Sequence, residues 1–275
     1  MAETAQPLET TGGTEILLRE DRGAIAILTL NRPEARNPLS EAMLAELGAS
    51  LDEISSDEAI KAVVLAANGP VFCAGHDLKE MTARRDDPDR GRAYFAEIMS
   101  ACSAVMQAIV KLPKPVIAAV EGPATAAGCQ LVASCDLAVA DEGAEFCTPG
   151  VNLGLFCSTP MVALSRNVSR KHAMEMLLLG DMISAQRARE FGLVNAVAPR
   201  GQVLGEALQM AEQITRKSTA TVKIGKEAFY RQIEMPLQAA YDYATEVMVT
   251  NMLHRDAEEG IGAFLEKRPP DWRDK

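Results

Sequence analysis

Hydrophobic and polar residues along this chain first form a sequence of short strand-like segments. Glu15–Arg19 and Ala24–Asn31 have strand-like patterns, and the turn residues between them predict a hairpin. Compact apolar runs follow at Lys61–Ala67, Val116–Val120 and Asp136–Ala140. Runs of this length that are bounded by turn residues are typical of strands buried on both faces.

Between these strands the apolar positions recur at helical spacing. Ser40 is expected to cap a helix that runs to Ser55, whose apolar residues step by four, four and three along one face. A longer helix is predicted over Gly91–Lys111, and the small residues from Ala124 open another helix through about Cys135. Alternating strands and helices predict a layered α/β core with crossover connections.

From about Gln202 onward the pattern becomes helical throughout. The four predicted helices are Gln202–Lys217, Thr219–Tyr230, Met235–Arg255 and Asp256–Leu265. They have more apolar surface than a small helical appendage could bury alone, so we interpret them as an oligomerisation layer. Packing back onto their own core is the alternative. The predicted organisation is a flexible leader over residues 1–13, a core over 14–201 and this helical region over 202–275.

Composition restricts the possible partners. The chain has 275 residues, of which 48% are hydrophobic, as in an ordinary globular protein. Acidic residues outnumber basic ones by 38 to 28, and a net charge of −10 repels phosphate backbones, so we expect no nucleic-acid partner. No stretch approaches the roughly 20 apolar residues that span a bilayer, so no membrane partner is expected.

Cysteine, histidine and the N-terminus suggest a compartment. Met1 to Gly13 has no basic residue and no apolar segment, which indicates neither a secretory signal nor a transit peptide. The six cysteines are scattered without a CxxC motif, and the three histidines lack metal-ligand spacing. These features predict reduced core cysteines, no metal and a cytoplasmic location.

Two segments share a design that could hold a negatively polarised oxygen. In Phe72–Glu80 and in Gly122–Gln130, small residues turn the backbone and a helix follows. The first amides of a helix have no internal acceptor and lie at the positive end of its dipole. Two such amides at one point would form an oxyanion hole, with His76 contributing one of them. Glycine-rich turns are usually structural, so neither segment is decisive alone.

Taken together, a series of motifs resembles the crotonase (enoyl-CoA hydratase/isomerase) superfamily over nearly the whole chain. The matching segments are Asn31–Asn37, Phe72–Glu80, Lys114–Gly122, Gly128–Leu131, Cys135–Ala140, Leu179–Ala188, Gly192–Asn195 and Ala263–Arg268. The resemblance implies an α/β spiral of repeated β-β-α units with a C-terminal helical trimerisation region. It also implies self-association as a homotrimer or as a dimer of trimers.

The resemblance assigns roles by position. The backbone amides of His76 and Ala127 would donate to the thioester oxygen of an acyl-CoA, with Ala127 in place of the usual glycine. The residues expected to line the coenzyme A channel are Ala35, Arg36, Ala74, Asp77, Leu78 and Lys79, the last as a phosphate contact. Phe264 and Lys267 would reach a neighbouring subunit's coenzyme A. No cofactor is implied beyond the coenzyme A thioester itself.

The catalytic positions depart from the family pattern. Hydratases of the family use two glutamates, and these align with Gln130 and Gly150, while an aspartate of some relatives aligns with Ser158. The loop around Ser158 resembles the divergent branch called enoyl-CoA hydratase domain-containing proteins. Without the acid–base pair, hydratase activity is expected to be weak or absent. Restoring both glutamates should raise it if the pocket has room.

Several functions therefore remain open from the sequence. The chain is either an enzyme that acts on acyl-CoA or a non-catalytic acyl-CoA-binding or assembly trimer. For an enzyme, hydration is the default reaction, and isomerisation, decarboxylation and thioester hydrolysis are the rivals. The His76 imidazole could replace a missing acid or base. A nucleophilic pairing of Cys157 with His76 would need a proximity that the sequence does not reveal.

Overall fold

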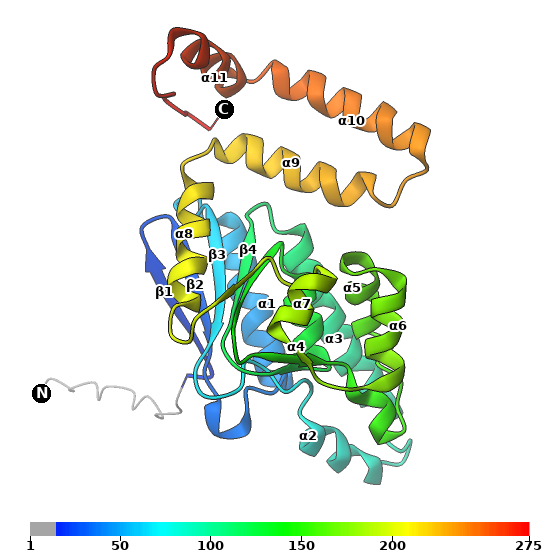
Figure 1. Cartoon of the computed structure of the whole chain (residues 1–275). Coiled ribbons are helices and arrows are strands. Elements are labelled where there is room, and N and C mark those ends of the chain that lie inside the picture. Colours follow the sequence, from blue (N-terminus) through cyan, green and yellow to red (C-terminus); the bar gives the residue numbers. More distant parts are fainter. Residues whose placement is uncertain (1–14, 275) are drawn as a thin grey trace, which may run out of the picture.

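A six-stranded sheet organises the core of the protein, of which a computed structural model describes residues 15–274 (Figure 1). Its strand order is β1-β2-β3-β4-β6-β9, and every neighbouring pair is parallel except the β1–β2 hairpin. The strands are β1 (Leu17–Arg22), β2 (Ile25–Leu30), β3 (Ala62–Ala67), β4 (Val116–Val120), β6 (Leu137–Asp141) and β9 (Ala196–Ala198). The predicted hairpin is confirmed, and the leader predicted over residues 1–13 lies outside the described residues.

A smaller sheet lies beyond the ends of the large one. It contains β5 (Ala124–Thr125), β7 (Glu145–Cys147) and β8 (Ile183–Ser184), and an isolated bridge from Cys73 to Ala124 extends it. The chain therefore repeats one unit, in which a strand of the large sheet is followed by a short strand of the small sheet and then by a helix. This repetition confirms the predicted α/β spiral of β-β-α units.

Helices fill the remaining chain. They are η1 (Pro33–Ala35), α1 (Glu41–Ser56), α2 (Leu78–Ala83), η2 (Arg84–Asp86), α3 (Arg92–Lys111), α4 (Ala127–Ser134), η3 (Pro149–Leu153), α5 (Pro160–Asn167), α6 (Arg170–Leu179), α7 (Ala185–Phe191), α8 (Val203–Thr215), α9 (Thr219–Gln232), α10 (Leu237–Met252) and α11 (Arg255–Glu266). Ser40 caps α1 as predicted, since its hydroxyl accepts a hydrogen bond from the Met43 amide at 3.2 Å.

The large sheet is covered on both faces. Successive strand residues alternate between the two faces, so Val63 and Leu65 of β3 join the core beneath α1, α3 and α4. Ala62 and Val64 face α8 instead. Burying each large aliphatic side chain contributes about 1.5–3 kcal/mol, which explains the continuous apolar runs in the sequence. α8 thus packs on the sheet, and the helices that stand away from the core begin with α9.

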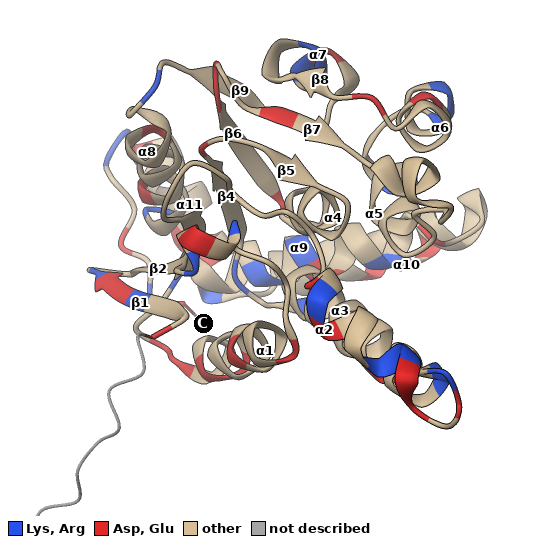
Figure 2. Cartoon of the chain, turned by 90° about the horizontal axis from the view of Figure 1, so that it is seen from below, with Lys and Arg blue, Asp and Glu red and all other residues tan. Residues whose placement is uncertain are grey.

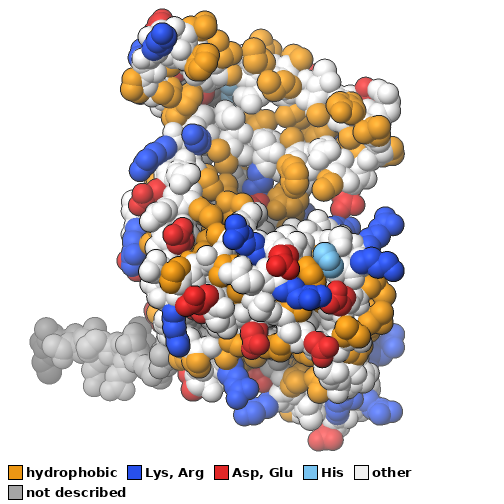
Figure 3. All heavy atoms as spheres, in the orientation of Figure 1, with side chains coloured by type: hydrophobic (Ala, Val, Ile, Leu, Met, Phe, Trp, Pro, Cys, Tyr) orange, Lys and Arg blue, Asp and Glu red, His pale blue; other side chains and the backbone are white. Residues whose placement is uncertain are grey.

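The three last helices carry much of the exposed apolar surface (Figure 3). Exposed side chains on α9, α10 and α11 include Phe229, Leu237, Tyr241, Met248, Phe264 and Leu265. α10 lies on the outer side of α9, away from the sheet (Figure 1). The boundary predicted between residues 201 and 202, and the trimerisation role of the helices after it, remain predictions.

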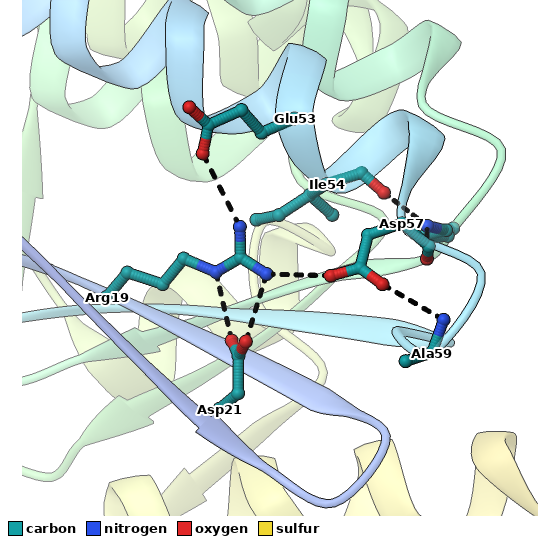
Figure 4. A network of polar contacts seen from close by, with 7 residues as sticks. Arg19, Asp21, Glu53, Ile54, Asp57 and Ala59 are labelled. Carbon is teal, nitrogen blue, oxygen red and sulfur yellow. Dashed lines mark hydrogen bonds and ion pairs between the residues drawn. The ribbon is translucent and has the colours of Figure 1, made fainter.

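Polar contacts fix the corner between the hairpin and α1 (Figure 4). The Arg19 guanidinium pairs with Asp21 and with Asp57 at 3.0 Å each, and with Glu53 at 3.6 Å. The buried Lys114 ammonium donates to the carbonyls of Ile54, in the last turn of α1, and of Asp57, the residue that follows the helix. A cation at the carbonyl end of a helix is favourable, so this corner ties β4 to the end of α1.

One described helix, α3, is by length and composition long and apolar enough to cross a membrane, contrary to the expectation that no stretch comes close to such a span. Its inner stripe of Ile98, Cys102, Val105, Met106 and Ile109 is buried in the core between α1 and α4. A helix in the core of a globular protein can have the same length and apolar composition.

Candidate functional site

The two glycine-containing bends are in direct contact. Cys73 bridges to Ala124, the Thr125 amide donates to the Cys73 carbonyl at 2.9 Å, and the Thr125 hydroxyl donates to the Ala74 carbonyl at 3.0 Å. A Cβ added to Gly128 would lie 2.2 Å from the Cys73 carbonyl oxygen, so only glycine permits this approach. The small sheet and α4 therefore hold segments together that lie 50 residues apart.

The amides of His76 and Ala127 lie at this junction. Gly75 has a φ of +93°, and a Cβ placed on it would lie 3.3 Å from the Ala127 nitrogen. Among residues 15–274, neither the His76 amide nor the Ala127 amide donates to a protein oxygen. Ala127 is the first residue of α4, where an amide has no partner within the helix. The two amides are therefore donors without a protein acceptor in the described chain, beside one close contact between the segments.

Ala126, the residue directly before Ala127, has a strained backbone conformation. Ala126 has φ 51° and ψ −117°, a conformation that residues other than glycine rarely adopt. Its amide donates to the Cys147 carbonyl at 2.9 Å, which holds it in place. Strain of this kind costs about 1–3 kcal/mol and is found where the surrounding structure requires it. Here it turns the chain from β5 into α4, which places the Ala127 nitrogen close to Gly75.

The His76 side chain is enclosed but has no hydrogen-bond partner in the described chain. Burial lowers the pKa of its imidazole, and the neighbouring Leu39 carbonyl offsets this in part without reaching hydrogen-bond geometry. The ring is therefore neutral at pH 7. The Cys157 sulfur instead accepts a hydrogen bond from the Gly150 amide at 3.3 Å, so no Cys–His hydrogen bond exists. Burial also raises the pKa of Cys157, which keeps it a thiol.

Gly150 has no space for a longer side chain. A Cβ there would lie 2.8 Å from the Cys157 sulfur, 3.1 Å from the Leu155 carbonyl oxygen and 3.2 Å from the Cys157 nitrogen. The thiol thus occupies the volume into which a side chain at position 150 would extend. The expectation that restored glutamates would raise hydratase activity depended on room in the pocket, and this packing leaves no such room at Gly150.

Gln130 lies one turn beyond Ala127 on the same face of α4. Its side chain is 3% exposed, and its Oε1 is buried with no partner among the described residues. Leaving a buried amide oxygen unsatisfied costs about 1–3 kcal/mol, so a ligand or water is expected to donate to it. Gln130 also lines a cavity of about 660 Å³, which we call the α4–α9 cavity. Its other walls include Met106 of α3, Val162 of α5, and Phe229 and Ile233 at the end of α9.

The residues expected to line a coenzyme A channel gather around the same bends. The Ala74 amide donates to the Arg36 carbonyl at 3.1 Å, which joins the loop after η1 to the first bend. Asp77 caps α2 by accepting from the amides of Lys79 and Glu80, and it pairs with Arg32 at 3.7 Å. Ala35 ends η1, while Leu78 and Lys79 are exposed at the start of α2. Basic and acidic residues alternate along α2 and the chain that leads from it to α3 (Figure 2).

Buried Asn37 was not identified from the sequence as a site residue, yet its hydrogen bonds hold the loop that follows η1. Its side chain accepts from the Arg32 amide at 2.8 Å and donates to the carbonyls of Asn68 and Val71. Asparagine after a turn gives no signal that distinguishes this role from an ordinary loop. Asp136, Lys226 and Tyr230 beside the α4–α9 cavity were likewise missed, because each reads as a routine surface residue.

Three further predicted residues are exposed. Ser158 donates its hydroxyl to the Phe156 carbonyl at 3.3 Å, and the next residue, Thr159, lines the α4–α9 cavity. Phe264 and Lys267 belong to the α11 end of the chain, and Figure 1 shows α11 at the opposite end of the molecule from α2. Within one chain, Phe264 and Lys267 therefore do not join the bends. No cluster of three metal-binding side chains occurs within the described residues.

Comparison with known proteins decides the family. The enoyl-CoA hydratase/isomerase family profile matches residues 20–275. The chain belongs to this family, within the crotonase superfamily. It is 45% identical over 269 residues to mouse enoyl-CoA hydratase domain-containing protein 3, covering 98% of this chain and 88% of that one.

Solved structures agree with this assignment. An enoyl-CoA hydratase from Mycobacterium smegmatis is 52% identical with a TM-score of 0.89, covering 94% of this chain and 99% of that one. Human enoyl-CoA hydratase domain-containing protein 3 is 46% identical with a TM-score of 0.89, covering 94% and 100%. The resemblance to the domain-containing branch is thereby confirmed. The absence of the catalytic glutamates, inferred from alignment, stays a prediction.

The expected cytoplasmic location is wrong by the same comparison. The mouse relative is named as mitochondrial, as are the rat and human proteins of that name. The expectation rested on composition and on residues 1–13, which carry no information about the homologues' compartment.

Replacing Ala126 with glycine should stabilise the protein, because glycine adopts this backbone conformation without steric strain. We expect Ala126→Gly to raise the free energy of unfolding by about 1 kcal/mol in urea titrations. The matched control is Ala133→Gly within α4, which should lower it by about 1 kcal/mol or more. A loss of stability in Ala126→Gly would show that the strain is absent.

The buried His76 ring should make stability depend on pH. Its folded-state pKa lies below the unfolded value, so the unfolded chain binds a proton first as the pH falls below about 6.5. Wild-type stability should therefore fall relative to His76→Asn between pH 7.5 and 5.5, by at most about 1.4 kcal/mol per pH unit. Parallel urea-unfolding profiles for the two proteins would contradict this.

Proposed function

We propose that this protein binds an acyl-CoA thioester and stabilises negative charge on the thioester oxygen with the amides of His76 and Ala127. One observation carries the proposal: a Cβ on Gly75 would lie only 3.3 Å from the Ala127 nitrogen, and among the described residues neither amide has a protein acceptor. Such donors are preorganised, so they lose little free energy on reorganisation when charge develops on the oxygen. The family's enoyl-CoA hydratase members act on thioesters of this class.

The surroundings of the two amides indicate where the coenzyme A and the acyl chain would lie. Coenzyme A would extend over the adjoining loops, with Ala35, Arg36, Ala74, Asp77 and Leu78 as channel residues. Lys79, in an acidic chain, would supply a local cation for a phosphate group. The acyl chain would run from Ala127 past the unpartnered Gln130 amide into the α4–α9 cavity, whose volume lies in the range of small-molecule sites.

Catalytic power is expected to be limited. Gln130 orients a water or a carbonyl but takes no proton at neutral pH, and Gly150 contributes no acid or base. General acid–base groups are each worth about 10²–10⁴-fold in rate. We therefore propose weak or absent hydratase activity, with neutral His76 as the nearest titratable group. Isomerisation, decarboxylation and thioester hydrolysis share the oxyanion step and remain the alternative reactions.

A non-catalytic acyl-CoA-binding or assembly trimer is the second candidate function. The apolar side chains exposed on α9–α11 favour it, because monomeric proteins rarely expose large contiguous apolar patches. In such a trimer, or in a dimer of trimers, Phe264 and Lys267 would reach the coenzyme A of a neighbouring subunit. Their exposure at the end of α11 leaves them free to do so.

The proposed oxyanion contact predicts that binding depends on the thioester carbonyl. Wild-type protein should bind butyryl-CoA roughly tenfold more tightly than S-butyl-CoA, a thioether that lacks this oxygen, by calorimetry. Ala127→Pro deletes one donor at a helix position that tolerates proline, and it should reduce this preference several-fold. Ala127→Gly keeps the amide and should preserve the preference. Equal affinities for the two ligands in folded wild-type protein would refute the proposal.

The packing around Gly150 predicts the outcome of restoring two carboxylates. Wild-type protein and Gln130→Glu/Gly150→Glu should both hydrate crotonyl-CoA slowly, because the Cys157 sulfur blocks the new side chain. Adding Cys157→Gly should raise turnover by about 100-fold or more, once the backbone shifts by a few tenths of an ångström. Cys157→Gly alone should change little. Full activity in the double variant would show that Cys157 does not obstruct position 150.

A further inference from the structure

A buried ion pair joins the C-terminal helices to the core. The Lys226 ammonium of α9 donates to the Asp136 carboxylate at 2.6 Å, and to the carbonyls of Ile109 and Lys114 at 3.0 Å each. The Lys226 side chain is only 7% exposed. The Tyr230 hydroxyl, one turn along α9, donates to the other oxygen of Asp136 at 2.9 Å. We call Asp136, Lys226 and Tyr230 the α9 clamp.

Little else holds the middle of α9 against the core. In the described chain no α9 residue is fully buried, and α9 packs chiefly against α10. On one side of the clamp lies a hollow of about 540 Å³ lined by Lys226, Tyr230 and the end of α3. On the other side lies the α4–α9 cavity, which Asp136 and Tyr230 also line. The clamp is thus a narrow polar contact between two hollows.

Weaker contacts hold the two ends of α9. The Thr219 amide at its start donates to Asp274 at 2.7 Å. Just beyond its end, Glu234 pairs with Arg166 of α5 at 2.8 Å, with both side chains more than half exposed. Exposed pairs of this kind contribute at most about 1 kcal/mol, whereas breaking a buried pair costs several times more. The clamp therefore dominates the position of the helix.

The position of α9 sets the shape of the cavity. Gln130, Ala133 and Ser134 of α4 lie along one wall, a length of roughly 6 Å at the helical rise of 1.5 Å per residue, and Asp136 follows just after the helix ends. Phe229 and Ile233, the neighbours of Tyr230 on α9, form the facing wall. A short acyl group bound at Ala127 would end near Gln130, one turn along α4, and would not reach these side chains. A medium-length acyl chain would continue between the two walls.

We propose that the α9 clamp fixes this helix as the outer wall of the acyl cavity and so determines the preference for medium-chain over short-chain acyl groups. The inference rests on the proposed function, because it takes the ligand to be an acyl-CoA held at the Ala127 amide. Tyr230 and Asp136 also line this cavity, and we assign them a positioning role because they hold Phe229 and Ile233 in place. Lys226 supplies the charge that holds the Asp136 carboxylate in place.

Tyr230→Phe tests the proposal with the smallest change, because it removes one hydroxyl and keeps the ring. We expect the affinity for decanoyl-CoA to fall roughly tenfold in calorimetry, as for the loss of a hydrogen bond to a charged group. The affinity for butyryl-CoA should stay within twofold. Tyr241→Phe on α10 is the matched control, since Tyr241 is 68% exposed, and neither affinity should change.

Amide hydrogen exchange supplies a second test. A residue with a purely structural role would not make the exchange rate of α9 depend on the length of the bound acyl chain. Decanoyl-CoA should slow exchange in α9 of the wild-type protein, and butyryl-CoA should not. In Tyr230→Phe the exchange of α9 should be faster without ligand. Lys226→Arg, which keeps the charge, should bind decanoyl-CoA more tightly than Lys226→Met does.

The outcomes separate the two proposals. The wild-type protein could prefer butyryl-CoA over S-butyl-CoA while Tyr230→Phe loses the same affinity for butyryl-CoA and decanoyl-CoA. That result would overturn the proposed role of the α9 clamp and leave the proposed function standing. An unchanged decanoyl-CoA affinity in that variant would overturn it as well. Failure of the wild-type protein to distinguish butyryl-CoA from S-butyl-CoA would instead contradict the proposed function.

Discussion

The site depends on the close approach of two backbone segments. The Cys73 carbonyl lies where a Cβ on Gly128 would be, and Gly75 lies against the Ala127 nitrogen. Hydrogen bonds from Thr125 to Cys73 and Ala74 hold the segments at this distance, and strain at Ala126 is the cost of turning the chain there. Because the contact is between main chains, the side chains around it are free to vary while the two donors keep their positions.

A contact between main chains leaves the neighbouring side chains free to differ, and this chain has Gln130 and Gly150 at the positions where the resemblance predicts glutamates. Gln130 presents a buried polar group to the cavity, and its Oε1 has no partner among the described residues. At Gly150 the Cys157 thiol fills the space next to the glycine. The two backbone amides and the side chains around them can therefore be considered separately, because only the amides depend on the contact between the bends.

Much of the core could be predicted from local patterns. The buried runs at Val116–Val120 and Lys61–Ala67 became β4 and β3, and Ser40 caps its helix through the Met43 amide as its residue type suggests. The hairpin turn moved to Gly23 and Ala24, because strand pairing extended β1 through Arg22. α8 packs on the sheet through Val203, Ala207 and Ala211, a partner choice that helical periodicity alone does not reveal.

The sequence by itself determined where strands, helices and glycine bends occur, because those depend on residue spacing, caps and backbone freedom within a few neighbours. It also indicated the family, and with it the two amides. Only the tertiary structure decided what those bends lie against, that Cys157 fills the space at Gly150, and that Lys226 meets Asp136 across 90 residues of chain. Contacts of that range depend on how complete layers pack, and packing is a property of the whole fold.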